Sequence, residues 1–271
     1  MRVLAASINP IDLKMRSGAA KERFPVEFPA ILGRDVAGLV QKVGEGVEGF
    51  AQGDRVFALA WHTYAEFCTV KASELARIPE GLEIPVASTV PLVSVTADQL
   101  IHQAAGVQQG QTVVLTGALG SVGRCAMFCA LEIGAKVIAG VRRKQLDEAR
   151  ALGAIEAIDI EDKNELVKLG IVDAVADTVG GEAGAALLAK VKPGGNFGSL
   201  VGPPQGAALH PLVHVNPMMA HPDAAAMVHY AEAVRDGKLK IPVERMLPLA
   251  DAAEAHSIAE KGGVGKIVLL A

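Results

Sequence analysis

The chain has 271 residues, of which 51% are hydrophobic and 21% are charged, and its formal net charge is −4. This composition is typical of a globular α/β protein and excludes disordered and collagen-like chains. A mildly acidic chain without a basic block offers no electrostatic footprint for nucleic acid or an anionic membrane, so we expect a small-molecule partner.

The three cysteines, Cys68, Cys125 and Cys129, are an odd number without the spacing of a disulfide framework, which favours a cytoplasmic protein. Cys125 and Cys129 are four residues apart in an apolar stretch. We interpret them as small apolar residues of a buried helix, with metal binding or redox chemistry as the alternative. No apolar run approaches the roughly 18 residues of a membrane span, so we expect no membrane partner.

Residues 1–88 are predicted to form a first domain. Short strand-like runs at 36–43, 55–59 and 64–70 are separated by glycine-rich turns. This punctuation predicts a small antiparallel barrel.

From about residue 111 the pattern changes to strands that alternate with helices. The predicted strands are 112–115, 136–139, 154–158, 172–176 and 196–201, and the predicted helices are 122–133, 144–152, 162–169 and 181–190. The strands are almost wholly apolar, as parallel strands covered on both faces should be. We therefore predict a doubly wound Rossmann domain over residues 89–221.

The last segment, 222–271, is expected to return to the first domain. It contains a predicted helix at 224–235, a strand at 244–247, a short helix at 249–260 and a final strand at 266–270.

A glycine-rich turn joins strand 112–115 to the helix that follows it. Its candidate cofactor-binding residues are Gly117, Leu119, Gly120, Ser121, Val122 and Gly123. Gly117 permits a tight bend, Gly120 lets the backbone approach a pyrophosphate, and Gly123 lets the helix pack closely. The free N–H groups and the dipole of the helix then hold the anion. The alternative is a glycine-rich turn in an α/β protein that binds no nucleotide.

The end of the next strand bears on the choice between NAD and NADP. Gly140 is followed by Arg142, Arg143 and Lys144, and there is no acidic residue to hydrogen-bond the ribose 2′-hydroxyl. Three cations at the start of a helix oppose its dipole, and a bound 2′-phosphate would compensate for this. We predict NADP(H), and solvated surface charges are the alternative.

These residues resemble the medium-chain dehydrogenase/reductase superfamily, and within it the zinc-free quinone oxidoreductase (zeta-crystallin-like) family. The resemblance covers nearly the whole chain. Besides the glycine turn, it rests on Ala6-Ser7-Ile8-Asn9-Pro10-Ile11-Asp12, Gly33-Arg34-Asp35, Gly53-Asp54-Arg55-Val56, Asp177-Thr178-Val179-Gly180-Gly181, Lys192-Pro193-Gly194-Gly195 and Gly265-Lys266-Ile267-Val268-Leu269.

The resemblance implies an α/β fold with a GroES-like barrel-type substrate domain, a Rossmann cofactor domain and hydride transfer in the cleft between them. It implies that Asn9 and Asp12 line the nicotinamide end as catalytic residues. It adds Thr96, Thr178, Val201, Gly202, Val215, Asn216 and Lys266 to the cofactor-binding residues. The alternatives are structural: Asn9 could shape a turn, and fold analogy alone supports Asn216 and Lys266.

The resemblance also implies chemistry without a metal. The zinc-dependent relatives carry a cysteine near the position of Asn9 and Gly-His-Glu where this chain has Gly33-Arg34-Asp35. The four-cysteine cluster of their structural zinc is absent, and the histidines have no convincing ligand spacing. We therefore expect no metal site.

The expected activity is NADPH-dependent hydride transfer to a quinone or a similar electron-poor acceptor. An enoyl or alkenal double-bond reductase is the alternative among enzymes, and an NADPH-binding protein without turnover is the alternative outside them. Trp61, His62 and Tyr64 are expected either to shape the substrate entrance or to pack.

Two expectations concern assembly. Judged against the family pattern, about thirty residues are expected ahead of the Ala-Ser-Ile-Asn-Pro segment, and without them the substrate domain loses a strand or two and exposes an edge. We also expect a homodimer, formed by strand addition near residues 212–215.

Overall fold

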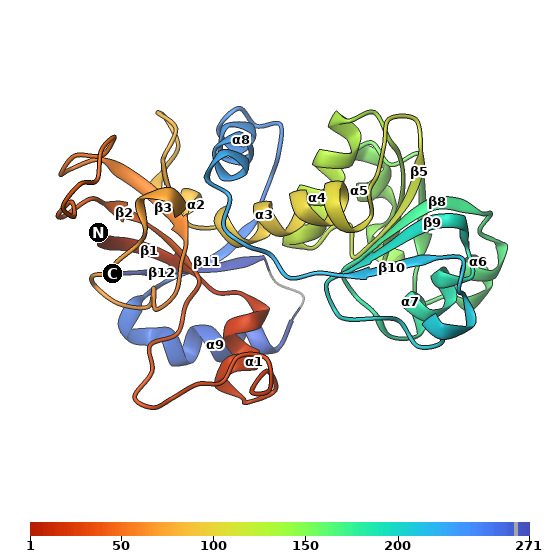
Figure 1. Cartoon of the computed structure of the whole chain (residues 1–271), viewed down its shortest axis with the longest axis horizontal. Helices are drawn as coiled ribbons and strands as arrows, with labels where there is room; N and C mark the ends of the chain where they lie inside the picture. Colours follow the sequence, from red (N-terminus) through yellow and green to blue (C-terminus); the bar gives the residue numbers. More distant parts are fainter. Residues whose placement is uncertain (263–264) are drawn as a thin grey trace. The chain divides into compact units, whose positions relative to one another are not determined.

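The computed structural model describes residues 1–262 and 265–271 (Figure 1). The chain divides into two compact units, and each is described by itself. The first consists of Met1–Val95 and Pro222–Ala271, and the second is Thr96–His221. The last fifty residues thus belong to the same unit as the first part of the chain.

The first unit is built on a six-stranded sheet in the order β11-β12-β1-β2-β3-β4. The strands are β1 (Arg2–Ser7), β2 (Asp35–Leu39), β3 (Arg55–Leu59), β4 (Leu75–Arg77), β11 (Val243–Pro248) and β12 (Lys266–Leu270). β1 has a partner on each side, so it is not an edge strand.

Two predictions for this sheet are wrong. The sheet is not wholly antiparallel, because a helical crossover joins β11 to β12 and the two pair in parallel. No strand forms over residues 64–70, where the described chain makes an isolated bridge between Arg2 and Phe67. Phe67 is 58% exposed, so this segment buries too little apolar surface to extend the sheet.

Helices cover the first sheet. Their bounds are α1 (Pro10–Arg16), α2 (Ile84–Ala87), α8 (Ala224–Arg235) and α9 (Ala252–Glu260), with short turns η1 (Ala72–Glu74) and η5 (Leu249–Asp251). α1 and α9 lie side by side (Figure 1), and α9 packs on β11 and β12. Ile8, Ala255, Ile267 and Leu269 form the buried apolar core between them.

The second unit is a parallel sheet in the order β10-β9-β8-β5-β6-β7. Its strands are β5 (Thr112–Thr116), β6 (Lys136–Val141), β7 (Glu156–Asp159), β8 (Val172–Asp177), β9 (Val191–Ser199) and β10 (His214–Pro217). Its helices are α4 (Ser121–Glu132), α5 (Leu146–Ala151), α6 (Lys163–Lys168) and α7 (Gly181–Leu188), with turns η3 (Arg143–Gln145) and η4 (Ala207–Leu209). This is the Rossmann strand order. From β5 the chain adds strands first on one side (β6, β7) and then on the other (β8, β9, β10), and such sheets bind ligands at the point where the order reverses, between β5 and β8.

The chain passes from the first unit to the second within one helix. α3 (Pro91–Gln99) continues into a π-helical turn, η2 (Leu100–Ala104), and the unit boundary lies after Val95. The sequence predicts the start of the Rossmann domain at residue 89, whereas the second compact unit begins at Thr96, inside a helix where no glycine or proline marks a boundary.

One helix, Ile84–Ala104, is long and apolar enough to cross a membrane by length and composition alone, contrary to the sequence expectation. However, 72% of its most apolar window is buried inside the protein. Core helices of globular proteins pass the same test, so the finding is weak evidence for a span.

Candidate active site

The glycine turn follows β5, at the point where the strand order of the second sheet reverses. Gly117 has φ +63°, and a Cβ there would lie 2.5 Å from Thr178 Oγ1. At Gly123 a Cβ would lie 2.0 Å from the carbonyl oxygen of Gly117. Because main-chain atoms cannot move aside as a side chain can, only glycine fits at position 123. Gly120 is exposed and immediately precedes α4.

The first residues of α4 present backbone donors at this turn. Ser121 and Val122 are half-buried, and their N–H groups have no acceptor within the helix. Together with the helix dipole, they form a site suited to an anion. Leu119 is buried beneath the turn, and its carbonyl accepts a hydrogen bond of 3.2 Å from Arg124 Nε. Arg124, which also pairs with Glu148, was not predicted from the sequence.

The end of β8 is tied to the end of β5. Asp177, only 1% exposed, accepts hydrogen bonds from Thr116 Oγ1 at 2.7 Å and from the backbone of Gly180 at 2.9 Å. Thr178 Oγ1 donates to the carbonyl of Thr116 at 2.8 Å. Asp177 therefore holds in place the loop that faces the glycine turn. In the sequence, Asp177 is part of a family motif but was not predicted as a site residue.

Two other predicted residues follow β9. Val201 is 46% exposed, and Gly202 has φ +98°. A Cβ on Gly180 would lie 2.7 Å from Val201 Cγ2, so the loops after β8 and β9 touch. Thr178, Val201 and Gly202 thus gather at one edge of the sheet.

The basic residues after β6 differ from one another in their partners. Arg143 forms ion pairs with Asp159 at 3.1 Å and Asp162 at 2.9 Å. Arg142 lies 3.6 Å from Glu161, and exposed Lys144 has no ion pair in the part of the chain that the structure describes. Arg143 is therefore the least available of the three for a ligand.

Four further residues that were predicted to bind the cofactor are buried or make contacts within the second unit. Gly140 is buried in β6, where a Cβ would lie 2.5 Å from Ile160 Cγ2. Val215 packs against the apolar core of the second unit. Asn216 Nδ2 donates to the carbonyl of Ala104 at 2.9 Å, and Thr96 is 8% exposed on α3. These surroundings lie within the second unit, and the cofactor-binding role of the four residues stays a prediction.

In the first unit, two predicted site residues, Lys266 and Asn9, form a buried polar network with Asp35, which was not predicted as a site residue. Lys266 Nζ donates to Asn9 Oδ1 at 2.7 Å, to Asp35 Oδ2 at 3.2 Å and to the carbonyl of Ile8 at 3.2 Å. Asn9 Nδ2 donates to Asp35 Oδ2 at 2.8 Å. The ammonium group has three hydrogens, and all three find acceptors within the first unit.

Asp12 and Tyr64 extend this network. Asp12 Oδ2 accepts hydrogen bonds from the Asn9 backbone at 2.9 Å and from the Tyr64 hydroxyl at 3.0 Å. Asp12 Oδ1 is buried without a partner. Burial raises the pKa of Asp12 to about 6, and the negative charge of Asp35 adds to the rise. Tyr64 therefore belongs to the network, and it also packs against the apolar core of this unit.

Known proteins resemble the chain along its whole length. Two family models match it, an alcohol dehydrogenase GroES-like domain over residues 1–82 and a zinc-binding dehydrogenase domain over residues 152–269. The mitochondrial NAD(P)H oxidoreductase of Mus musculus is 31% identical, over 99% of this chain and 80% of that protein. This chain belongs to the quinone oxidoreductase-like family of medium-chain dehydrogenases/reductases. It is an enzyme, an oxidoreductase that depends on a nicotinamide dinucleotide.

Two further members of the family are informative. The 2-methylene-furan-3-one reductase of Solanum lycopersicum is 29% identical over 99% of this chain and 70% of that protein. The solved structure of the quinone oxidoreductase from Coxiella burnetii covers 100% of this chain and 89% of its own, with a TM-score of 0.87 and 28% identity. The predicted GroES-like and Rossmann folds are confirmed.

The first unit of the present chain also contains a pocket of about 640 Å³. Phe24, Ile31, Trp61 and His62 are among the residues that line it. The guanidinium carbon of Arg34 lies 3.5 Å from the Trp61 ring centroid, so Trp61 both packs and borders the pocket. The two roles predicted for Trp61, packing and shaping a substrate entrance, are therefore compatible with each other.

The raised pKa of Asp12 predicts the pH dependence of stability of this oxidoreductase. The folded state binds this proton more tightly than the unfolded state, whose pKa is near 3.8. The free energy of unfolding therefore falls as pH rises from about 4 to about 6, by up to about 3 kcal/mol. In Asp12→Asn this contribution is absent, so urea denaturation should show a free energy of unfolding that lacks this fall between about pH 4 and pH 6.

Asp54→Asn is the matched control. A backbone hydrogen bond from Ala51 and the pairing with Arg77 lower the pKa of Asp54, so its contribution has the opposite sign. A difference between Asp12→Asn and the wild type that stays constant from pH 4 to pH 7 would refute the raised pKa.

Proposed function

We propose that this protein is a zinc-independent, NADPH-dependent oxidoreductase that transfers hydride to a quinone or a similar electron-poor acceptor. The observation that carries the proposal is the glycine turn between β5 and α4, where a Cβ on Gly123 would lie 2.0 Å from a main-chain oxygen. A turn this tight brings the backbone donors of α4 together at the ligand edge of the sheet.

The residues present suit a dinucleotide. The backbone of Ser121 and Val122 would hold the pyrophosphate, and Arg142 with Lys144 would hold the 2′-phosphate. When bound, the nicotinamide supplies the hydride, and the protein contributes orientation and partial exclusion of water. Asn9 and Asp12, predicted as catalytic residues at the nicotinamide end, belong to the buried network of the first unit, which would hold them in position.

The positions of the catalytic zinc ligands in related dehydrogenases do not fit a metal here. Arg34 places a permanently charged guanidinium at one of them, with its Nε donating to the carbonyl of Ala60 at 2.9 Å. Asp35 already receives the ammonium of Lys266, and the Asn9 amide bridges the two. These cations repel a metal ion, which supports zinc-independent hydride transfer.

The cofactor preference is tested at Lys144. Replacing Lys144 with alanine removes a cation that has no ion pair in the described part of the chain, so the affinity for NADPH should fall about tenfold while that for NADH is unchanged. Fluorescence titration with both dinucleotides measures this. Arg143→Ala is the matched control and should have a smaller effect, because Asp159 and Asp162 already bind Arg143. Equal losses for NADPH and NADH would contradict the proposal.

The acceptor is tested by following NADPH oxidation at 340 nm with 1,4-benzoquinone and with a small enone. We expect turnover with the quinone to exceed turnover with the enone by at least about tenfold. The tomato relative, a 2-methylene-furan-3-one reductase, favours the enone as the second candidate. A faster reaction with the enone would replace the quinone by an activated double bond, and oxidation with neither acceptor would refute both.

A homodimer remains part of the proposal. β10 is an edge strand of the second sheet, and Leu212, just before it, is 65% exposed. An unpaired edge next to exposed apolar side chains suits strand addition between two copies.

A further inference from the structure

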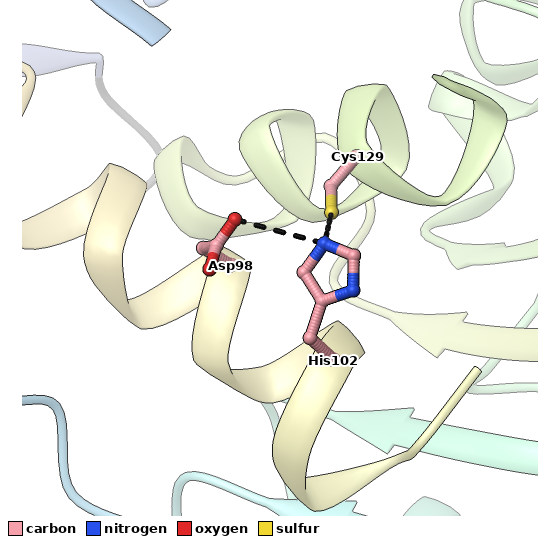
Figure 2. Close-up of side chains that lie close together, drawn as sticks. All are labelled: Asp98, His102 and Cys129. Carbon is pink, nitrogen blue, oxygen red and sulfur yellow. Dashed lines mark hydrogen bonds and ion pairs between the residues drawn. The ribbon is translucent and has the colours of Figure 1, made fainter. Parts of the chain in front are cut away.

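The second unit brings together three side chains that the proposed function does not use. Asp98 lies on α3, His102 on η2 and Cys129 on α4, and Figure 2 shows the imidazole of His102 between the carboxylate and the sulfur. His102 Nε2 lies 3.3 Å from Cys129 Sγ and 3.7 Å from Asp98 Oδ1. All three potential ligand atoms lie within 4.8 Å of one another.

We propose that Asp98, His102 and Cys129 form a binding site for a divalent transition-metal ion, with Zn²⁺ as the best fit. At ordinary zinc–ligand bond lengths, a tetrahedral site separates its nitrogen from its sulfur or oxygen ligands by about 3.4 to 3.6 Å. The distances of 3.3 Å to sulfur and 3.7 Å to oxygen lie within about 0.3 Å of two edges of such a site, so small side-chain shifts would complete it.

The donor set selects the class of cation. A thiolate, an imidazole and a carboxylate suit Zn²⁺ and disfavour Mg²⁺ and Ca²⁺, which prefer oxygen ligands alone. Three protein ligands leave a fourth position for water. The His102 side chain is 44% exposed and that of Asp98 is 26% exposed, so the site is open to solvent on one side. Cys129 closes the other side, since it is only 4% exposed.

The helices hold the three groups in place. Asp98 and His102 are four residues apart, a spacing that puts two side chains on one face of a helix. η2 packs against α4, which carries Cys129. The π-helical geometry of η2 supports the assignment, because such turns occur frequently at functional sites. A bound ion would therefore clamp α4, the helix that begins at the glycine turn, against η2.

The cluster could not be predicted from the sequence, because His102 and Cys129 are 27 residues apart and lie on different helices. None of the three lies at Asn9 or within Gly33-Arg34-Asp35, the positions compared above with catalytic zinc ligands of related dehydrogenases. The proposed site is thus separate from the proposal that hydride transfer needs no zinc.

The test is a titration with Co²⁺ in a Cys68→Ser/Cys125→Ser background, which leaves Cys129 as the only cysteine. We expect one equivalent of Co²⁺ to produce a thiolate-to-cobalt absorption band and a higher Tm, and Zn²⁺ to displace the Co²⁺. His102→Gln and Cys129→Ser should each weaken binding at least tenfold. His214→Gln, which changes an exposed histidine of β10, should leave binding unchanged.

Since the His102 side chain is partly exposed, His102→Gln should keep the metal-free Tm of the parent, which separates loss of a ligand from loss of the fold. Absence of the thiolate band up to about 1 mM Co²⁺, or its persistence in His102→Gln, would overturn the proposal. The cluster would then be a thiol–imidazole hydrogen bond only.

Discussion

Replacing Gly123 with alanine is expected to abolish dinucleotide binding and to lower the free energy of unfolding by about 3 kcal/mol or more. The added Cβ would lie 2.0 Å from the carbonyl oxygen of Gly117 and 2.7 Å from the carbonyl carbon of Ala118. Both are main-chain atoms, so the clash is relieved only by opening the turn that places the α4 donors. Fluorescence titration with NADPH and urea denaturation measure the two effects.

Two other glycines provide controls. At Gly120 an alanine Cβ meets its nearest neighbour, the Gly117 oxygen, at 3.2 Å, so Gly120→Ala should fold but bind NADPH more weakly. At Gly170 nothing lies within 4 Å of an added Cβ, and Gly170→Ala should change neither property. Wild-type NADPH affinity in Gly123→Ala would show that the turn does not position the cofactor.

Replacing Lys266 with methionine is expected to lower the free energy of unfolding by about 3 to 5 kcal/mol. The change leaves the carboxylate of Asp35, which is completely buried, without its ammonium partner 3.2 Å away. It also removes the donor to Asn9 Oδ1. The hydroxyl of Ser7 and the backbone N–H of Leu92 still bind Asp35, but neither neutralises its charge. Urea denaturation measures the loss.

Lys71→Met is the matched control, because Lys71 is 79% exposed in its pair with Glu74 and should contribute less than about 1 kcal/mol. Asp35→Asn combined with Lys266→Met should be more stable than Lys266→Met alone, since no buried charge is then left unpaired. A loss below about 1 kcal/mol in Lys266→Met would mean that the network does not hold this unit together.

Much of the second unit could be predicted from the sequence because its signals are local. Apolar runs that alternate with helical periodicity predict parallel strands, and α4 and β8 lie within a few residues of their predicted positions. The glycine turn was also predictable, since its strand and helix are its immediate neighbours. The segment at 64–70 was predicted wrongly, because apolar content alone does not tell whether a sheet edge is there to receive it.

The networks could not be predicted because their members are distant in the sequence. Lys266 binds Asn9 across 257 residues, and Asn9 binds Asp35 across 26. Asn9 and Lys266 were singled out by resemblance to a family, whereas Asp35 is indicated as their partner only by the fold. Cys129 was likewise interpreted as an apolar helix residue, because nothing near it in the sequence points to His102.

The claim on which the account depends is that backbone donors at the glycine turn hold a dinucleotide pyrophosphate. A crystal structure of the protein with NADPH tests this directly. We expect pyrophosphate oxygens within hydrogen-bond distance of the N–H groups of Ser121 and Val122, at the start of α4. A dinucleotide bound elsewhere, with this turn left without contacts, would contradict it.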